Sequence, residues 1–361
     1  MDPAEAKFRE LVAAASGLQD ERRWEEAGRT WIEAARTAVD ARAVLAARQC
    51  LLAASEAFRR DDRLGPAERA LETLLSLGPD AVQRAAARIQ LAGIRSAKGD
   101  RDGASALQVE DLGADVPPAV RAIGIDVAIA IAWQWGSRDE LRSLVERLAE
   151  VEGADGVAVA FRRAQLRRAD GDLEGAEQAY RALVARLSVD DAPGAAVGAA
   201  SAQAELAEVM VLAGRPDEGL ALYEAAVASQ AQAGRGSLSW LAEAGRVRAA
   251  REAGLDVLTT RLEQGLAYAL DRQLVTVAVV LDAALGEAMG ARDPAAAALR
   301  LERAVADADR VGLRHAAGRA RLALAALSGE PRRRALLDRA VVDLADDVPW
   351  RLRAERERDR P

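Results

Sequence analysis

Apolar and polar positions along the chain recur with the spacing of a helix, and no long window alternates with the period of two that marks a strand. The pattern is clearest in residues 157–229, where one motif occurs twice. In each copy a glycine ends a helical run, a small residue follows five positions later, and a tyrosine lies four positions after that. The motif residues are Gly171, Ala176 and Tyr180 in the first copy and Gly214, Gly219 and Tyr223 in the second. Two helices joined by a tight turn and repeated in this way predict a solenoid of helix hairpins.

The same spacing recurs along the whole chain when the small residue after each turn is used as an anchor. The anchors are Ala27, Ala67, Ala104, Leu141, Ala176, Gly219, Thr259, Ala295 and Ala335. They lie about 38 residues apart on average, and six of the nine positions five residues upstream hold glycine. Glycine suits these positions because it ends a helix in the left-handed conformation without a steric penalty. The sequence therefore predicts an all-α protein, an α-solenoid of about nine antiparallel helix hairpins.

These positions resemble the tetratricopeptide repeat (TPR) family of helical-hairpin proteins. The matching residues are the small residues Ala164 and Ala207 of the first helix, the turn glycines, the small residues that open the second helix, and the tyrosines between hairpins. The period is longer than the 34 residues typical of the family, and most of the family's first-helix Trp and Tyr are missing. The resemblance is therefore to a divergent member with an extended period, and it implies a right-handed, TPR-like superhelix.

The chain shows no clear boundary between domains. No segment is long and polar enough to be a flexible linker, so we expect a single solenoid domain over residues 1–346. Residues 347–361 differ from the rest because acidic and basic residues alternate there. We expect this C-terminal segment to be a charged tail that is solvated or frayed.

The composition supports helices and argues against two classes of partner. About a quarter of the residues are alanine, the strongest helix former. The net charge of −7 and the pI near 5.2 argue against a general nucleic-acid or anionic-membrane binder. Arginine far outnumbers lysine and asparagine is absent, a bias typical of GC-rich genomes that suggests a bacterial source.

Three observations lead us to expect a cytoplasmic protein without membrane insertion. Cys50 is the only cysteine, so no intramolecular disulfide can form. Residues 1–5 lack the basic start of a signal peptide. The most apolar run, Leu274 to Leu285, is too short to cross a bilayer and contains Asp282.

Few residues have the types and spacings that catalysis requires. His315 is the only histidine, which rules out a His/Cys metal cluster, and neither lysine lies in a phosphate-binding loop. We expect His315 to be a surface or packing residue and Cys50 a small core residue, with a reactive thiol as the alternative for Cys50. Residues 170–175 imitate the start of an EF-hand calcium loop, but Arg181 occupies the place of its bidentate glutamate. No enzyme activity, metal or cofactor is therefore expected.

The TPR resemblance implies that the first helix of each hairpin lines a concave groove that binds a partner. Transferring the family's groove positions by their offset from the anchors produces a candidate set. The candidates are Arg59, Arg60, Asp126, Trp133, Gln134, Phe161, Gln165, Arg168, Glu208 and Arg248. Trp133, Phe161 and Arg168 combine aromatic anchors with a charged group, as peptide recognition requires. A place in the core is the alternative for Trp133.

The charged members of this set favour one class of partner over another. TPR domains that bind chaperone tails hold a terminal carboxylate with lysine and asparagine, and neither residue type occupies a candidate position. Arg59, Arg60, Arg168 and Arg248 would instead suit an acidic or amphipathic segment of a partner protein.

The leading hypothesis is a non-enzymatic scaffold or adaptor that binds a partner protein or peptide through its concave groove. One alternative is a ligand-sensing or regulatory module, like the helical regions of some bacterial signalling and transcription proteins. A second alternative, an α/α-type enzyme, would require a deep pocket lined by paired acids and aromatic residues. Three Phe, three Tyr and six Trp scattered along the chain do not predict such a pocket.

Overall fold

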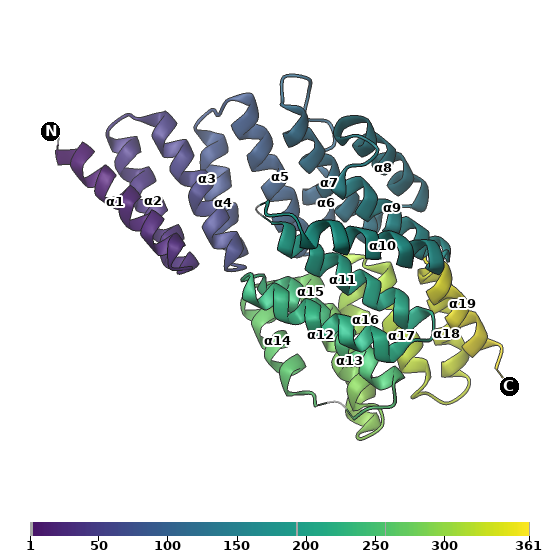
Figure 1. Cartoon of the computed structure of the whole chain (residues 1–361). Helices are drawn as coiled ribbons and strands as arrows, with labels where there is room; N and C mark the ends of the chain where they lie inside the picture. The colour runs from purple at the N-terminus through teal and green to yellow at the C-terminus, as the bar shows by residue number, and fades with distance from the viewer. Residues whose placement is uncertain (1–2, 193, 257, 361) are drawn as a thin grey trace. The chain divides into compact units, whose positions relative to one another are not determined.

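The computed structural model describes residues 3–192, 194–256 and 258–360, and every regular element in these ranges is an α-helix (Figure 1). The chain divides into two compact units, in place of the one domain expected over residues 1–346. Unit 1 comprises residues 1–96 and 102–127, and unit 2 comprises residues 97–101 and 128–361. The predicted all-α solenoid is confirmed, because consecutive helices pack against each other as antiparallel hairpins within the units.

Unit 1 is built from short hairpins, of which α1 to α4 pack in chain order. Its helices are α1 (Pro3–Asp20), α2 (Trp24–Asp40), α3 (Val44–Arg60), α4 (Leu64–Ser76), α5 (Ala81–Ala97), α6 (Arg101–Ser105) and most of α7 (Pro118–Trp135). Alanines let the helices approach closely, and larger residues such as Trp31, Phe58 and Leu74 fill the spaces between them. Cys50 is buried in this core, and burial raises the pKa of its thiol to about 11, so its prediction as a core residue is confirmed.

Unit 2 contains the end of α7 and twelve further helices in the part of the chain that the structure describes. They are α8 (Arg138–Glu152), α9 (Val157–Asp170), α10 (Leu173–Ser188), α11 (Ala195–Leu212), α12 (Pro216–Gln232), α13 (Gly236–Glu252), α14 (Thr260–Asp271), α15 (Val275–Met289), α16 (Pro294–Val311), α17 (Arg314–Ala325), α18 (Arg332–Asp343) and α19 (Val348–Arg358). Every consecutive pair from α8 to α19 is in contact. Contacts from α9 to α11, α13, α15 and α17 in turn join the first helices of successive hairpins, which form the inner layer of the unit.

Several turns inside the hairpins share one backbone conformation, although those at Gly136 and Gly290 do not. Gly171 and Gly214 have φ of 90° and 77°, in the left-handed region that the sequence predicted. In the first two hairpins Arg22 and Asp62 adopt the same conformation, with φ of 59° and 54°, although neither is glycine. A left-handed residue therefore ends the first helix in these four hairpins, and glycine adopts that conformation at the lowest steric cost.

The register of the last hairpins differs from the prediction. Ala295 is exposed, and Ala297 occupies the buried position two residues later. Because α16 begins at Pro294, Ala295 falls in an exposed first turn. The same shift of two residues occurs in the following hairpin, where Ala335 is exposed and Leu337 is buried.

The two motif tyrosines pack between hairpins, as predicted. Tyr180 is fully buried among residues of α9, α10 and α11, and its ring meets the edge of Phe161 at a centroid distance of 5.8 Å. Tyr223 packs against Ala242 of α13. Gly245 is needed beside it, because an added Cβ would lie 2.3 Å from the Tyr223 ring.

Residues 347–361 do not form the solvated tail that the sequence predicted. Residues 348–358 form helix α19, and Asp347 caps its N-terminus. Trp350 and Ala354 are buried in a cluster with residues of α18, α17 and α11. These two residues lie four positions apart on one helix face, so the alternating charges conceal a short apolar stripe. Pro361 lies outside the described residues.

Helix α11 is, among the described residues, the one helix long and apolar enough to cross a membrane. In unit 2 it is a core helix, with 56% of its 18-residue window buried. It contacts α10, α12 and α13, which explains why apolar residues surround its axis. Its two acidic residues, Glu205 and Glu208, belong to the site described next.

Candidate binding cavity of unit 2

The inner helices of unit 2 line an open cavity of about 400 Å³. Residues from the end of α7 and from α9, α11, α13, α15 and α17 form most of its wall, and α12 adds two more. Five of the ten predicted groove residues lie in this wall, namely Trp133, Phe161, Arg168, Glu208 and Arg248. Curvature of the inner layer therefore gathers positions that are spread over residues 133–248 of the sequence.

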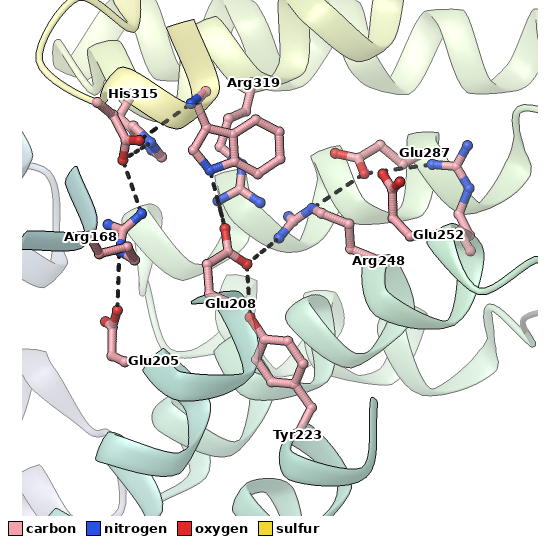
Figure 2. Close-up of polar contacts among 12 residues, drawn as sticks. Arg168, Glu205, Glu208, Tyr223, Arg248, Glu252, Glu287, His315 and Arg319 are labelled. Atoms are coloured by element: carbon pink, nitrogen blue, oxygen red, sulfur yellow. Dashed lines mark hydrogen bonds and ion pairs between the residues drawn. The ribbon is translucent and has the colours of Figure 1, made fainter. Parts of the chain in front are cut away.

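Glu208 is the centre of the polar contacts in the wall (Figure 2). Arg319 Nη1 donates to Glu208 Oε1 at 3.1 Å, and the Tyr223 hydroxyl donates to Oε2 at 2.9 Å. Trp350 Nε1 also donates to Oε1, at 3.2 Å, and Arg248 Nη1 lies 3.6 Å from Oε2. One carboxylate of α11 thus joins α12, α13, α17 and α19.

The surroundings of Glu208 determine its charge. Burial alone would raise the pKa of this carboxyl, but Arg319 and Arg248, with smaller contributions from Arg168 and the Tyr223 hydroxyl, outweigh burial and lower the pKa to about 2. Burial and the nearby Glu208 charge raise the pKa of Tyr223 well above its ordinary value. At neutral pH Glu208 is therefore an ionised acceptor and Tyr223 is a neutral donor.

A second polar cluster lies at the end of the cavity nearest α9 (Figure 2). Arg168 Nη1 donates to Asp347 Oδ2 at 3.1 Å, and Arg168 Nε lies 3.7 Å from Glu205 Oε2. His315 Nε2 lies 3.2 Å from the same Asp347 oxygen. Burial acts to raise the pKa of Asp347, but Arg168 and then His315 outweigh it and hold that pKa well below its usual range.

Five buried polar atoms of wall residues have no hydrogen-bond partner among the described residues. Three of them, Arg168 Nε, Arg248 Nε and His315 Nε2, lie 3.2–3.7 Å from carboxylate oxygens. The other two are Arg319 Nη2 and Gln230 Oε1. Burial and the neighbouring Arg248 charge lower the pKa of Arg319 relative to an ordinary arginine. Buried polar groups are normally paired, but these two atoms lie beneath the accessible surface of the wall.

A second cavity, of about 260 Å³, lies beside the first. The two walls share Arg248, Glu287 and Arg319. The second wall alone includes Trp350 and Arg353 of α19. Arg248 Nε lies 3.5 Å from Glu287 Oε2, so the shared side chains are joined to each other. They form a polar partition between the two spaces.

No protein-family model and no curated protein matches the chain. Among solved structures, the chain is similar to a STAND-class signal transduction ATPase with a tetratricopeptide repeat sensor from Pyrococcus horikoshii, at 14% identity and a TM-score of 0.47. The match covers 91% of this chain and 51% of the other, so this chain spans about half the length of that protein. A circular tandem repeat protein with novel repeat topology and enhanced subunit contact surfaces matches at 14% identity and a TM-score of 0.18, covering 98% of this chain and 89% of the other. At these values neither structure carries an argument about this chain, and the TPR assignment stays a resemblance.

The remaining predicted groove residues do not line the cavity. They are Arg59, Arg60, Asp126, Gln134 and Gln165. Gln165 is buried behind the wall and donates to Glu205 at 3.0 Å. Gln134 lies in a small neighbouring pocket, and the other three belong to unit 1, where Arg59 and Arg60 pair with Glu56 of their own helix. A partner-binding role for any of the ten stays a prediction.

Four charged residues of the site are not among the ten predicted groove residues. They are Glu205, Glu287, Arg319 and Asp347. Glu287 lies eight positions before the predicted anchor Ala295, the same offset that led to Arg168, although the structure moves that anchor to Ala297. Arg319 lies eighteen positions before Leu337, which is one of the groove offsets of the family. This offset applies only when the last anchor is moved by two residues, from Ala335 to Leu337. Asp347 belongs to no repeat, and no signal in the pattern points to it.

His315 was expected at the surface or in packing, and it is a partly exposed residue of the cavity wall.

Proposed function

We propose that the chain is a non-enzymatic helical-repeat protein whose unit 2 binds a peptide segment of a partner protein at the side chains around the central cavity. The observation that carries this proposal is the convergence of aromatic and charged side chains from successive inner helices on one space. Its volume of about 400 Å³ lies in the range typical of ligand sites.

The wall has the chemistry that a peptide requires. Trp133 and Phe161 supply aromatic surface, and clusters of this kind carry most of the binding energy in peptide and protein recognition. The same wall holds the guanidinium groups of Arg168, Arg248 and Arg319, which suit an acidic or amphipathic segment.

The protonation states in the wall support binding rather than catalysis. A general base works best when its pKa lies near the operating pH. Glu208, with a pKa of about 2, is a weak base, and four donors already surround its two oxygens. Asp347 is held by Arg168 in the same way.

Random peptides displayed on phage and selected on the immobilised full chain would test the proposal. Calorimetry would then compare the affinity of selected peptides for the wild type and for two matched variants. Ala316→Phe adds a ring at the cavity wall, whereas Ala225→Phe adds the same ring on the exposed face of α12. We expect Ala316→Phe to weaken binding about 10-fold or more and Ala225→Phe to change it less than about two-fold. Equal affinities for the two variants, or no selected binder, would contradict the proposal.

A small polar molecule is the second candidate ligand, because the volume of the cavity is also sufficient for one. A screen of small organic acids and amines by thermal shift, on the same variants, tests this role in a ligand-sensing module. A shift in melting temperature that Ala316→Phe abolishes and Ala225→Phe retains, in the absence of peptide binding, would favour it.

A further inference from the structure

Helix α19 is held on unit 2 by few apolar contacts. Trp350 and Ala354 are its buried residues, whereas α11 and α13 bury residues along their whole length. A cleft of about 1170 Å³ is lined by α19 and by the hairpin turns at Gly171 and Gly214, although Val348 of α19 lies against Gly171. Because elements with few buried contacts open most easily, α19 is suited to leave its place without unfolding the rest of the unit.

Two side chains of the C-terminal segment contact the residues that surround the central cavity. Asp347 is held by Arg168 and lies beside His315, and both of these residues line the cavity. Trp350, one turn later, donates its Nε1 hydrogen to Glu208. Arg319 and Arg248 lie over the Trp350 ring, with guanidinium carbons 4.0 and 5.8 Å from the ring centroid. Both charge pairing and cation–π contact therefore hold this segment.

We infer that α19 occupies the partner site of unit 2 as an intramolecular ligand. We also infer that the segment of the partner protein that binds at this site is a helix with the same anchors. These anchors are an acidic N-cap residue, a tryptophan three positions later and a small residue four positions after that, as in Asp347, Trp350 and Ala354. The inference deepens the proposed function and rests on it. The spacing matters because all three residues must face the unit when the segment is helical.

Occupancy by α19 and by a partner helix is mutually exclusive, since both need Arg168 and Glu208. A segment tethered to the chain acts at an effective concentration in the millimolar range for short linkers, so even weak contacts keep it in place. A partner can make contacts in the central cavity that α19 does not make, because α19 contributes no residue to the cavity wall. A partner that repeats the anchors and also extends a side chain into this space gains contacts that α19 does not make.

The test uses a labelled synthetic peptide of residues 345–360 and the full chain with α19 released by Asp347→Ala and Trp350→Ala. Fluorescence anisotropy measures peptide binding to this double variant, to the wild type and to Leu352→Ala. Leu352 is 46% exposed on α19, so its substitution is the matched control. We expect the double variant to bind the peptide at least about 10-fold more tightly than either of the other chains. Peptides that carry Asp347→Ala or Trp350→Ala should bind it about 10-fold more weakly than the unmodified peptide.

A double variant with wild-type circular dichroism and cooperative melting that fails to bind the peptide would overturn the inference. Hydrogen exchange of the wild type decides the matter independently if the double variant does not fold. We expect amides of α19 to exchange at least about 10-fold faster than those of α17 and α18, and equal rates would overturn the inference. Phage-selected peptides that bind at the cavity while the 345–360 peptide does not would leave the proposed function standing alone. In the opposite outcome the 345–360 peptide binds, but Ala316→Phe weakens the binding of no phage-selected peptide. That outcome would show that the central cavity plays no part in partner binding.

Discussion

Arg168 and Asp347 form a buried ion pair although they lie 179 residues apart in the sequence. Arg168 Nη1 and Asp347 Oδ2 are 3.1 Å apart, and each side chain is 6% exposed. The pair links α9 to the N-cap of α19, which are in contact within unit 2 (Figure 1). A buried charge without its partner is costly, so the two residues depend on each other.

Replacing Arg168 with alanine should therefore destabilise unit 2 strongly. The variant leaves the buried Asp347 carboxylate with His315 and the Trp350 backbone N–H but without its arginine partner. Breaking a buried ion pair in this way costs about 3–5 kcal/mol of the free energy of unfolding. Urea denaturation measures the loss. Arg181→Ala is the control, because Arg181 pairs with Glu177 on an exposed helix face and should cost about 0–1 kcal/mol. Similar losses for the two variants would contradict the structural role assigned to the buried pair.

Stability should fall in acid because of the two buried carboxylates. The pKa values of Glu208 and Asp347 are lowered in the folded state, so the unfolded chain binds more protons as the pH decreases. The contribution of Glu208 is fully present above its ordinary pKa of 4.5 and is lost as the pH falls toward its folded value of about 2. Urea denaturation between about pH 3 and pH 7 measures this loss.

Two variants separate the contribution of Glu208 from general acid effects. Glu208→Gln should be less stable at neutral pH, because Arg319 and Arg248 lose their shared partner, and its stability should fall less steeply in acid. Glu218→Gln removes a solvent-exposed carboxylate that pairs with Arg215, where solvent screens the interaction, and should keep the wild-type slope nearly unchanged. Identical slopes for Glu208→Gln and the wild type would show that Glu208 is not the titrating group.

The hairpin contacts predict the effect of enlarging small residues. Ala176 and Ala207 are fully buried where helices meet, so Ala176→Leu and Ala207→Leu should overpack the contact and cost about 1–3 kcal/mol each. Ala182→Leu, on the exposed side of α10, should change stability by less than about 0.5 kcal/mol. Thermal melting measures all three, and unchanged melting of both buried variants would show that the hairpin register is wrong.

The left-handed turn positions predict opposite effects at two sites. Gly171→Ala should cost about 1–2 kcal/mol, because φ of 90° is unfavourable for any residue with a Cβ. Arg22→Gly should instead be neutral or stabilising by about 0.5 kcal/mol, because it relieves the same strain at φ of 59° while making the unfolded chain more flexible. Chemical denaturation of the full chain measures both, and a large loss of stability for Arg22→Gly would contradict the strain argument.

The sequence by itself determined the helices, the hairpins and the first six anchors. These features follow from interactions within about 40 residues, such as the left-handed turn at Gly171 and the burial of Ala176 against its own hairpin. Offsets from the anchors were enough to select Trp133, Arg168 and Glu208 for one face, because the helical period fixes which side chains share that face.

Only the tertiary structure decided how the chain divides into two units and what closes the site. The contacts between Arg168 and Asp347 and between Glu208 and Trp350 span 179 and 142 residues. They depend on small rotations that accumulate from one hairpin to the next, and no local pattern encodes the sum of those rotations. The alternating charges of residues 351–360 predict solvent exposure when considered alone. Their helix is held on unit 2 because accumulated curvature brings Arg168, Glu208 and Arg319 to the start of α19, where Asp347 and Trp350 lie.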